Sequence, residues 1–372
     1  MERTLALLAV NVTSVARPQA DGQRRQSGFD VLRIGAIFGV IAIHVFSGLV
    51  SNPAVRGSGS WWLAVFADIG FIWAVPVFVM VSGALLLRPT GHMDGPAAFY
   101  RKRLVRLGWA FVFWQVFYIV VVRIGMSHQE LSARKIAAIV FSGNAYTHLY
   151  FLWLIVGLYL VAPILVAFLA DGGPRRARWF AAVTMATTTC AYMASSVLGH
   201  FGVSAALPLT AFTQWLPYVG YFLAGWALRD VRLAGRSLWL GLAGTCVVIV
   251  ANVLLYAQPQ AVPLLSAVLP VNYLGPLVML SAVGVFVVVN SVMDRVSVRV
   301  IAGRALGVVA DAVFGVYLCH FFLLLLADRL STTLSQRTEY WWAAIAMFAA
   351  VTVVSFWVSI ALRRVPYLRR LF

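Results

Sequence analysis

The chemically most informative residues are an arginine and a histidine inside an apolar run. Arg33 and His44 lie in "FDVLRIGAIFGVIAIHVF", residues 29–46, which otherwise has the composition of a membrane-spanning segment. Eleven residues of α-helix make about three turns and rise about 16 Å, so both side chains share one helix face. This face joins a cation, which can bind an anion at the membrane edge, to a buried imidazole, which can exchange a proton.

Each of the two residues also has a structural explanation. Taken alone, Arg33 fits a topology anchor at a helix end equally well. A histidine deep in a span is costly and usually faces a cavity or a partner, so we favour a functional role for His44. Asp30 precedes Arg33 by three residues, which predicts an ion pair that fixes the guanidinium.

A second deep histidine, His320, lies in "VADAVFGVYLCHFFLL", with Tyr317 three residues earlier on the same face. A functional role in a buried site is one explanation for His320, because ionisable groups within a span usually face a cavity or a partner. A histidine that only bonds a neighbouring backbone carbonyl explains the position equally well. Cys319 points about 100° away from its neighbour, and we interpret it as a packed residue rather than a nucleophile.

A basic cluster in "FYRKRLVRLGW" provides Arg101, Arg103 and Arg106 at the start of an apolar segment. Guanidinium groups three residues apart can bind a phosphate together, and anionic lipid is the competing ligand. Ser82, in "VPVFVMVSGALLL", is a candidate for a channel wall. Close helix packing around such a small residue is at least as good an explanation.

His148 and Trp153 stand at the expected outer end of another span and suit a sugar-binding lip. An interfacial aromatic belt explains the tryptophan equally well. The sequence has no metal-ligand spacing, so we predict no metal, and it has no nucleotide-binding glycine loop.

Composition defines the fold class, because 62% of the 372 residues are hydrophobic and only 11% are charged. These values and the recurring apolar runs indicate an all-α, polytopic membrane protein. We predict about ten transmembrane helices with both termini cytoplasmic. They lie near 31–50, 68–88, 104–123, 149–169, 178–198, 212–228, 237–256, 272–292, 308–327 and 340–362.

The net charge of +17 would suggest nucleic acid, but its distribution follows membrane topology instead. With the N-terminus inside, nearly all of the Lys and Arg residues fall in cytoplasmic segments. The exceptions are Arg56, Arg123, Arg134, Lys135, Arg329 and Arg337. We therefore expect membrane lipids and no nucleic acid among the partners.

The first residues, "MERTLALLAVNV", imitate a short signal peptide, but cleavage there would place Arg24 and Arg25 outside, against the charge pattern. We predict a flexible cytoplasmic tail over 1–28 and a single transmembrane domain over 29–372.

Together these segments resemble the membrane-bound acyltransferase family 3, in the type without an appended soluble domain. The resemblance rests on Arg33 and His44 in their stretch, "VPVFVMVSGALLL", "RKRLVR", "HLYFLWLIVGLYLVAPIL" and "FGVYLCH", in the order of the family. It covers nearly the whole chain from Phe29 onward.

The resemblance implies an O-acyltransferase of the bacterial cytoplasmic (inner) membrane. The donor would be an acyl coenzyme A, usually acetyl-CoA, with its phosphates on Arg33 and the basic cluster. The acceptor would be a hydroxyl of a surface glycan or exopolysaccharide, or of its lipid-linked oligosaccharide precursor. His44 would act as general base, with an acyl-histidine intermediate as the second possibility. His320 and Tyr317 would be candidates to orient the acceptor or to stabilise the oxyanion, and Ser82 would lie with the cofactor-binding residues.

Two other classes of protein share some of these features. A carrier or flippase of a lipid-linked glycan also buries ionisable residues, and a scaffold subunit of an export system needs no chemistry. The absence of repeat symmetry and the scarcity of acidic residues within the spans count against a carrier.

Overall fold

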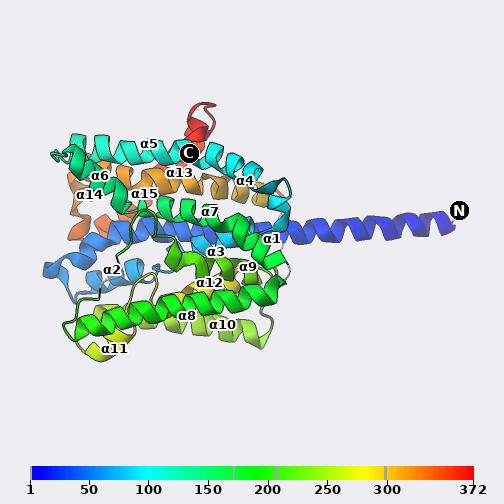
Figure 1. Cartoon of the computed structure of the whole chain (residues 1–372), viewed down its shortest axis with the longest axis horizontal. Coiled ribbons are helices and arrows are strands. Elements are labelled where there is room, and N and C mark those ends of the chain that lie inside the picture. The colour runs from blue at the N-terminus through cyan, green and yellow to red at the C-terminus, as the bar shows by residue number, and fades with distance from the viewer. Residues whose placement is uncertain (1, 171, 206–207, 297–299) are drawn as a thin grey trace.

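The computed structural model describes the backbone of residues 2–170, 172–205, 208–296 and 300–372, and their side chains except those of 2–26, 106 and 300–302. This part of the chain is helical and contains no strand, which confirms the all-α prediction. The helices pack into one bundle (Figure 1). They are α1 Glu2–Ser51, α2 Gly59–Ile69, α3 Ala74–Leu86, α4 Gly95–Arg103, α5 Trp109–Phe117, α6 Ala133–Ser142, α7 Tyr150–Ala170, α8 Gly173–His200, α9 Val219–Leu228, α10 Arg236–Ala257, α11 Pro263–Val268, α12 Pro276–Met293, α13 Val300–Leu330, α14 Thr332–Ser335 and α15 Trp341–Arg363.

The described residues contain nine helical segments that are long and apolar enough to cross a membrane. The chain is therefore a multi-pass membrane protein. The remaining predicted span, 212–228, is shorter than predicted: its apolar helix covers only Leu216–Leu228. Pro217 explains this, because proline is accepted in the first turn of a helix but ends regular hydrogen bonding before it.

Helix α1 is the centre of the bundle. It contacts α2, α3, α12, α13 and α15, so its apolar residues from Phe29 onward are largely buried. Its first half projects beyond the other helices (Figure 1). The flexibility and the cytoplasmic location of the tail over 1–28 stay predictions.

Two glycines allow α3 and α9 to cross in close contact. A Cβ atom at Gly83 would lie 1.8 Å from the Phe222 carbonyl oxygen, and one at Gly225 would lie 1.8 Å from the Met80 carbonyl oxygen. Small residues at a helix crossing are the usual means of close approach in a membrane. This crossing holds α3, which carries Ser82, against the short helix α9.

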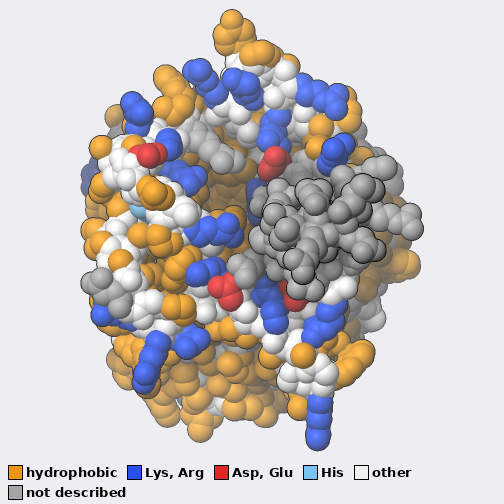
Figure 2. Space-filling model, turned by 90° about the vertical axis from the view of Figure 1, so that its right-hand side faces the viewer, with side chains coloured by type: hydrophobic (Ala, Val, Ile, Leu, Met, Phe, Trp, Pro, Cys, Tyr) orange, Lys and Arg blue, Asp and Glu red, His pale blue; other side chains and the backbone are white. Residues whose placement is uncertain are grey.

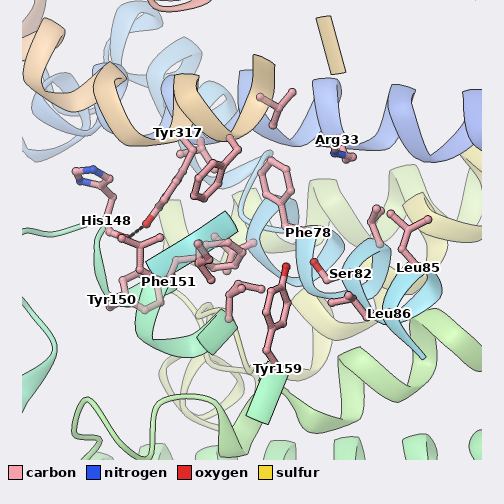
Figure 3. A pocket seen from close by; sticks show the side chains of 18 of the residues that line it. Arg33, Phe78, Ser82, Leu85, Leu86, His148, Tyr150, Phe151, Tyr159 and Tyr317 are labelled. Carbon is pink, nitrogen blue, oxygen red and sulfur yellow. Dashed lines mark hydrogen bonds between the residues drawn. The ribbon is translucent and has the colours of Figure 1, made fainter. Parts of the chain in front are cut away.

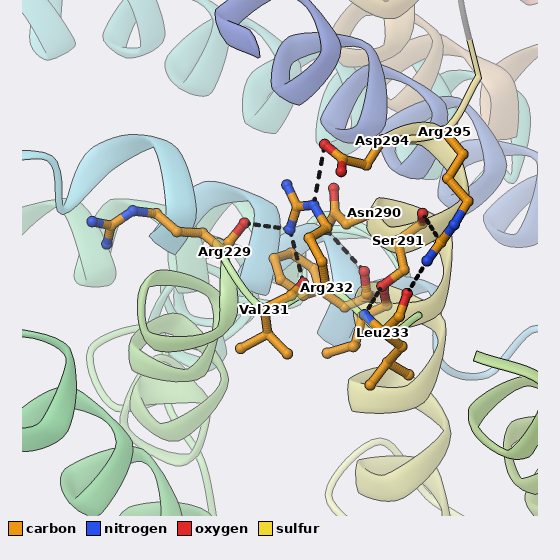
Figure 4. Close-up of polar contacts among 10 residues, drawn as sticks. Arg229, Val231, Arg232, Leu233, Asn290, Ser291, Asp294 and Arg295 are labelled. Carbon is orange, nitrogen blue, oxygen red and sulfur yellow. Dashed lines mark hydrogen bonds and ion pairs between the residues drawn. The ribbon is translucent and has the colours of Figure 1, made fainter. Parts of the chain in front are cut away.

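Arginine side chains connect the segment after α9 to the end of α12 (Figure 4). Arg232 forms an ion pair with Asp294 at 3.6 Å and donates to the Arg229 carbonyl, while Arg295 donates to the Leu233 carbonyl. These contacts connect the segment after α9 to the end of α12.

Lys and Arg side chains gather on the end of the bundle from which α1 projects (Figure 2). The connections from α3 to α4, from α7 to α8 and from α9 to α10 lie at this end (Figure 1). The helices next to these connections carry the exposed residues Arg101 and Lys102 on α4, Arg175 on α8 and Arg236 on α10. We call this the basic end, and the positive-inside rule predicts that it faces the cytoplasm.

Candidate active site

A cavity of about 530 Å³ lies between α1, α3, α7 and α13. Its walls are largely apolar, with a small number of polar groups, which is the usual composition of a small-molecule site. In Figure 3 Arg33 and His148 lie at opposite sides of the view, with Phe78, Phe151 and Tyr317 between them. The polar lining comprises Arg33, His44, Ser82, Arg103, Thr147, His148, Tyr150, Tyr159, Tyr273, Asp311 and Tyr317.

Charged side chains line the end of the cavity that is nearer the basic end. Arg33 on α1 forms the predicted ion pair with Asp30, at 3.7 Å. Asp311 on α13 pairs with Arg363 at 3.7 Å. Each carboxylate therefore balances one guanidinium.

Arg103, the last residue of α4, is the second guanidinium of the cavity wall. Its guanidinium carbon lies 5.3 Å from the ring centroid of Phe99 and 5.7 Å from that of Tyr159. Its Nε is buried and has no hydrogen-bond partner in the described part of the protein. A buried donor without an acceptor is costly, so this position favours an anionic ligand.

Three histidines from three different elements meet at the other end of the cavity. The ring centroid of His320 on α13 lies 5.4 Å from that of His44 on α1 and 5.1 Å from that of His148 in the turn before α7. His44 and His148 are 6.3 Å apart. His44 lies seven residues before the end of α1 at Ser51, about 10 Å along the helix, so the cluster is nearer the end opposite the basic end.

The backbone of its own helix selects one tautomer of His320. Its Nδ1 lies 2.7 Å from the Tyr317 carbonyl oxygen and 3.1 Å from that of Val316. A carbonyl can only accept, so Nδ1 carries the proton and Nε2 holds the lone pair of the neutral ring. His320 is fully buried and lies behind the cavity wall, not in it.

Aromatic contacts and one hydrogen bond hold His148 in the wall. The Tyr317 hydroxyl donates to the His148 carbonyl at 2.7 Å, and the Phe321 ring stacks on the imidazole with centroids 5.4 Å apart. His148 is only 3% exposed, yet neither of its ring nitrogens forms a hydrogen bond of acceptable geometry. Because Tyr317 uses its proton on this carbonyl, it is not available as an oxyanion donor in this arrangement.

Tyr118 positions the turn of α13 that carries His320. Its hydroxyl donates to the Leu318 carbonyl at 3.1 Å and accepts from the Phe322 N–H at 3.0 Å. Its ring also lies 4.9 Å from that of His148. A π-helical segment begins at Tyr118, and such segments are frequent at functional sites.

The cavity brings together six of the residues that the sequence singled out, while others lie elsewhere. In the wall are Arg33, His44, Ser82, Arg103, His148 and Tyr317. Asp30 and His320 lie directly behind it. Trp153 packs against Phe111 at 4.7 Å and Phe212 at 5.9 Å, away from the cavity, and the Arg106 side chain lies outside the described residues.

Arg101 is exposed on the outer side of α4 and does not line the cavity. Its neighbour Lys102 is held by Asp94 at 2.8 Å, and this hydrogen bond lowers the pKa of the Asp94 carboxyl. Of the basic cluster, the structure therefore places Arg103 in the cavity wall and leaves Arg101 on the surface.

Sequence reasoning missed Asp311, Tyr159 and Tyr118. Asp311 had a usable signal, since an acidic residue within a predicted span usually faces a cavity or a partner. Tyr159 and Tyr118 had none, because a tyrosine in an apolar run is compatible with any packed position.

The chain matches the family model of the acyltransferase domain, acyltransferase family 3, over residues 26–364. It belongs to this acyltransferase family. No curated protein and no solved structure matches it. As a membrane acyltransferase it needs a site for an activated acyl donor beside a group that can move a proton, and the cavity provides candidates for both. Among the described residues the three histidines are not arranged as metal ligands.

Proposed function

We propose that the protein is an O-acyltransferase that moves an acyl group from an acyl coenzyme A to a hydroxyl of a glycan. Acetyl is the expected acyl group, and the acceptor is a surface or exopolysaccharide or its lipid-linked oligosaccharide precursor. One observation carries the proposal: a single cavity has guanidinium groups at one end and histidines at the other.

The charged end of the cavity suits the nucleotide part of the donor. Guanidinium groups bind phosphate oxygens through paired, charge-assisted hydrogen bonds, and Arg33 and Arg103 both line the cavity. The unpartnered Nε of Arg103 is a donor that a phosphate would satisfy. Arg33 and Asp311 mark this end as the entrance for the donor.

The apolar middle of the cavity suits the pantetheine arm and the acyl chain. Val40 and Ile43 on α1 and Phe78 on α3 form its walls between the charged end and the histidines. Arg33 and His44 are separated by about 16 Å along α1, which an extended arm would span with its thioester at His44. The helix thus holds the donor at both of its ends.

His44 supplies the acid–base chemistry at the thioester in this proposal. A hydroxyl must lose its proton as it attacks the thioester carbonyl, and the leaving sulfur must gain one. A neutral imidazole can serve both needs. A transient acyl-histidine, formed by attack of the ring nitrogen itself, is the second route.

The acceptor side of the proposal rests on the hydroxyl-rich wall beside the histidines. Thr147, Tyr150 and Tyr273 line the cavity there, and hydroxyl and aromatic groups together suit a sugar. With the basic end in the cytoplasm, the protein would lie in the bacterial inner membrane, take its donor from inside and complete transfer near the outer side.

A reconstituted assay tests this function. Purified protein in lipid vesicles receives acetyl-CoA labelled in the acetyl group, together with membranes from a strain that lacks the gene. We expect labelled glycan, released coenzyme A and saturable binding of acetyl-CoA. A carrier or a scaffold would neither bind nor consume acetyl-CoA, so the absence of both would overturn the proposal.

A further inference from the structure

Three of the four buried imidazole nitrogens without a hydrogen-bond partner in the described part of the protein lie in the histidine cluster, and the fourth is Nδ1 of His92. Neither ring nitrogen of His148 has a hydrogen bond of good geometry in the described part of the protein, although the Leu318 backbone lies within reach of the ring. Nε2 of His320 has no partner there either, and both residues are almost completely buried. Native proteins rarely leave such groups unsatisfied unless a ligand or a reaction uses them. His148 is a residue of the cavity wall, so it adjoins the space that a ligand would occupy, and a rotation of its ring would uncover a nitrogen that is covered in this arrangement.

We propose that His148 is a second catalytic residue, which binds the acceptor hydroxyl and takes its proton, and that His320 returns this proton to His44. The inference deepens the proposed acyl transfer and rests on it. The two proton transfers belong to two different histidines of the cavity wall. His44 gives a proton to the leaving thiol, and His148 takes one from the acceptor hydroxyl.

The positions of the two histidines in the fold indicate which of them faces the donor and which faces the acceptor. His44 shares one face of α1 with Arg33, so it belongs with the donor that Arg33 anchors. His148 comes from the turn before α7, next to Thr147 and close to Tyr150, whose side chains form the hydroxyl-rich wall. An acceptor held by this wall would present its hydroxyl to His148 before it could reach His44.

The distances allow His320 to serve both cavity histidines. Rings joined by an N–H···N hydrogen bond have centroids roughly 5 Å apart, since the bond spans about 3 Å and each ring adds about 1 Å. The observed separations are 5.1 Å to His148 and 5.4 Å to His44, while His320 Nε2 has no hydrogen-bond partner among the described residues, so the rings must rotate to form the bond. His320 Nδ1 stays on its backbone carbonyls, so only Nε2 can accept and return the proton.

The proposed transfer balances in atoms and protons. The acceptor oxygen forms a bond to the thioester carbonyl carbon, and the carbon–sulfur bond breaks. The hydroxyl proton goes to His148 and passes through His320 Nε2 to His44. His44, now an imidazolium, gives this proton to the leaving thiolate, which restores all three neutral rings.

The contacts of His148 show a ring that is held in place and left reactive. Phe321 stacks on it with an interplanar angle of 4°, and the Tyr118 ring meets it edge-on. Tyr317 fixes its backbone carbonyl. The side chain therefore has a fixed orientation, while its ring nitrogens keep at most a contact of poor geometry with the Leu318 backbone, as a positioned base requires.

The test uses His148→Ala and His148→Gln in the reconstituted full-length protein, with His200→Ala as a control at an exposed histidine on α8. Three quantities are measured: binding of acetyl-CoA, slow hydrolysis of acetyl-CoA by water, and transfer to membranes of the deletion strain. Imidazole is then added to His148→Ala. Glutamine keeps hydrogen-bonding capacity but cannot take a proton.

We expect both His148 variants to bind and slowly hydrolyse acetyl-CoA like the parent protein, while transfer falls at least about a hundredfold. Free imidazole should restore part of the transfer in His148→Ala and none in His200→Ala, which should resemble the parent. Near-normal transfer in either His148 variant, or a joint loss of binding and transfer without rescue, overturns the proposal. An inactive parent protein would instead refute the acyl transfer on which it rests.

Discussion

Removal of the Arg33 guanidinium should weaken acetyl-CoA binding without preventing folding. Hydrogen bonds to charged groups contribute about 1.5–3 kcal/mol, so one lost phosphate contact predicts an affinity lower by about 10- to 100-fold. The Arg33 side chain is only 23% exposed, so solvent screens it little. Arg33→Ala also leaves the Asp30 carboxylate unbalanced at the entrance, which adds repulsion of the phosphate.

The neighbouring charge provides a variant with the opposite expected effect. Asp30 holds Arg33 at 3.7 Å and competes with a phosphate for it, so Asp30→Asn should bind acetyl-CoA at least as tightly as the parent protein. Arg33→Lys should recover only part of the affinity, because an ammonium cannot replace a bidentate fork. Arg175→Ala, which removes an exposed arginine on α8, is the matched control and should bind normally.

Isothermal titration of detergent-solubilised protein with acetyl-CoA at two ionic strengths measures these effects. The affinity of the parent protein should fall as salt rises, and Arg33→Ala should show a weaker dependence on salt. Equal affinity in Arg33→Ala and Arg175→Ala would refute the assignment of Arg33 to the donor phosphates.

Three further predictions concern positioning, packing and protonation. Tyr118→Phe should lower kcat with little change in KM, because the ring remains while the α13 turn loses its hydroxyl contacts. A rise in KM by the same factor as the fall in kcat would contradict this. Gly83→Ala should destabilise the bundle by about 1–3 kcal/mol in thermal unfolding, since its Cβ meets the Phe222 backbone, whereas Gly35→Ala, with open space around it, should not. Nitrogen NMR should find the proton of neutral His320 on Nδ1; a proton on Nε2 would exclude the relay.

Local helix geometry accounts for the part of the site that the sequence predicts. The spacing of Arg33 and His44 fixes their common face without knowledge of any other helix, and both line the same cavity. The Asp30–Arg33 pair is likewise a contact within one helix turn. The long apolar runs fix most of the spans, because a bilayer accepts little else of that length.

Contacts between distant segments account for what the sequence could not predict. The sequence suggests a surface lip at His148, but the turn before α7 packs this residue against α13, next to His320. The hydropathy of the sequence around His148 is compatible with an exposed position as well as with a buried one. Trp153 is a predicted site residue but lies outside the cavity wall. It packs instead against Phe111 and Phe212, which are distant from it in the sequence.

The assignment of His44 is tested most directly by His44→Ala, in the reconstituted assay and in a deletion strain that expresses it at the level of the parent protein. The variant should insert, fold and bind acetyl-CoA normally, while transfer of the acetyl group falls at least about a hundredfold, the usual contribution of a positioned acid or base. A histidine with a purely structural role would fail in expression or lose binding and transfer together. Near-normal glycan acetylation by His44→Ala at matched protein level would contradict the central claim.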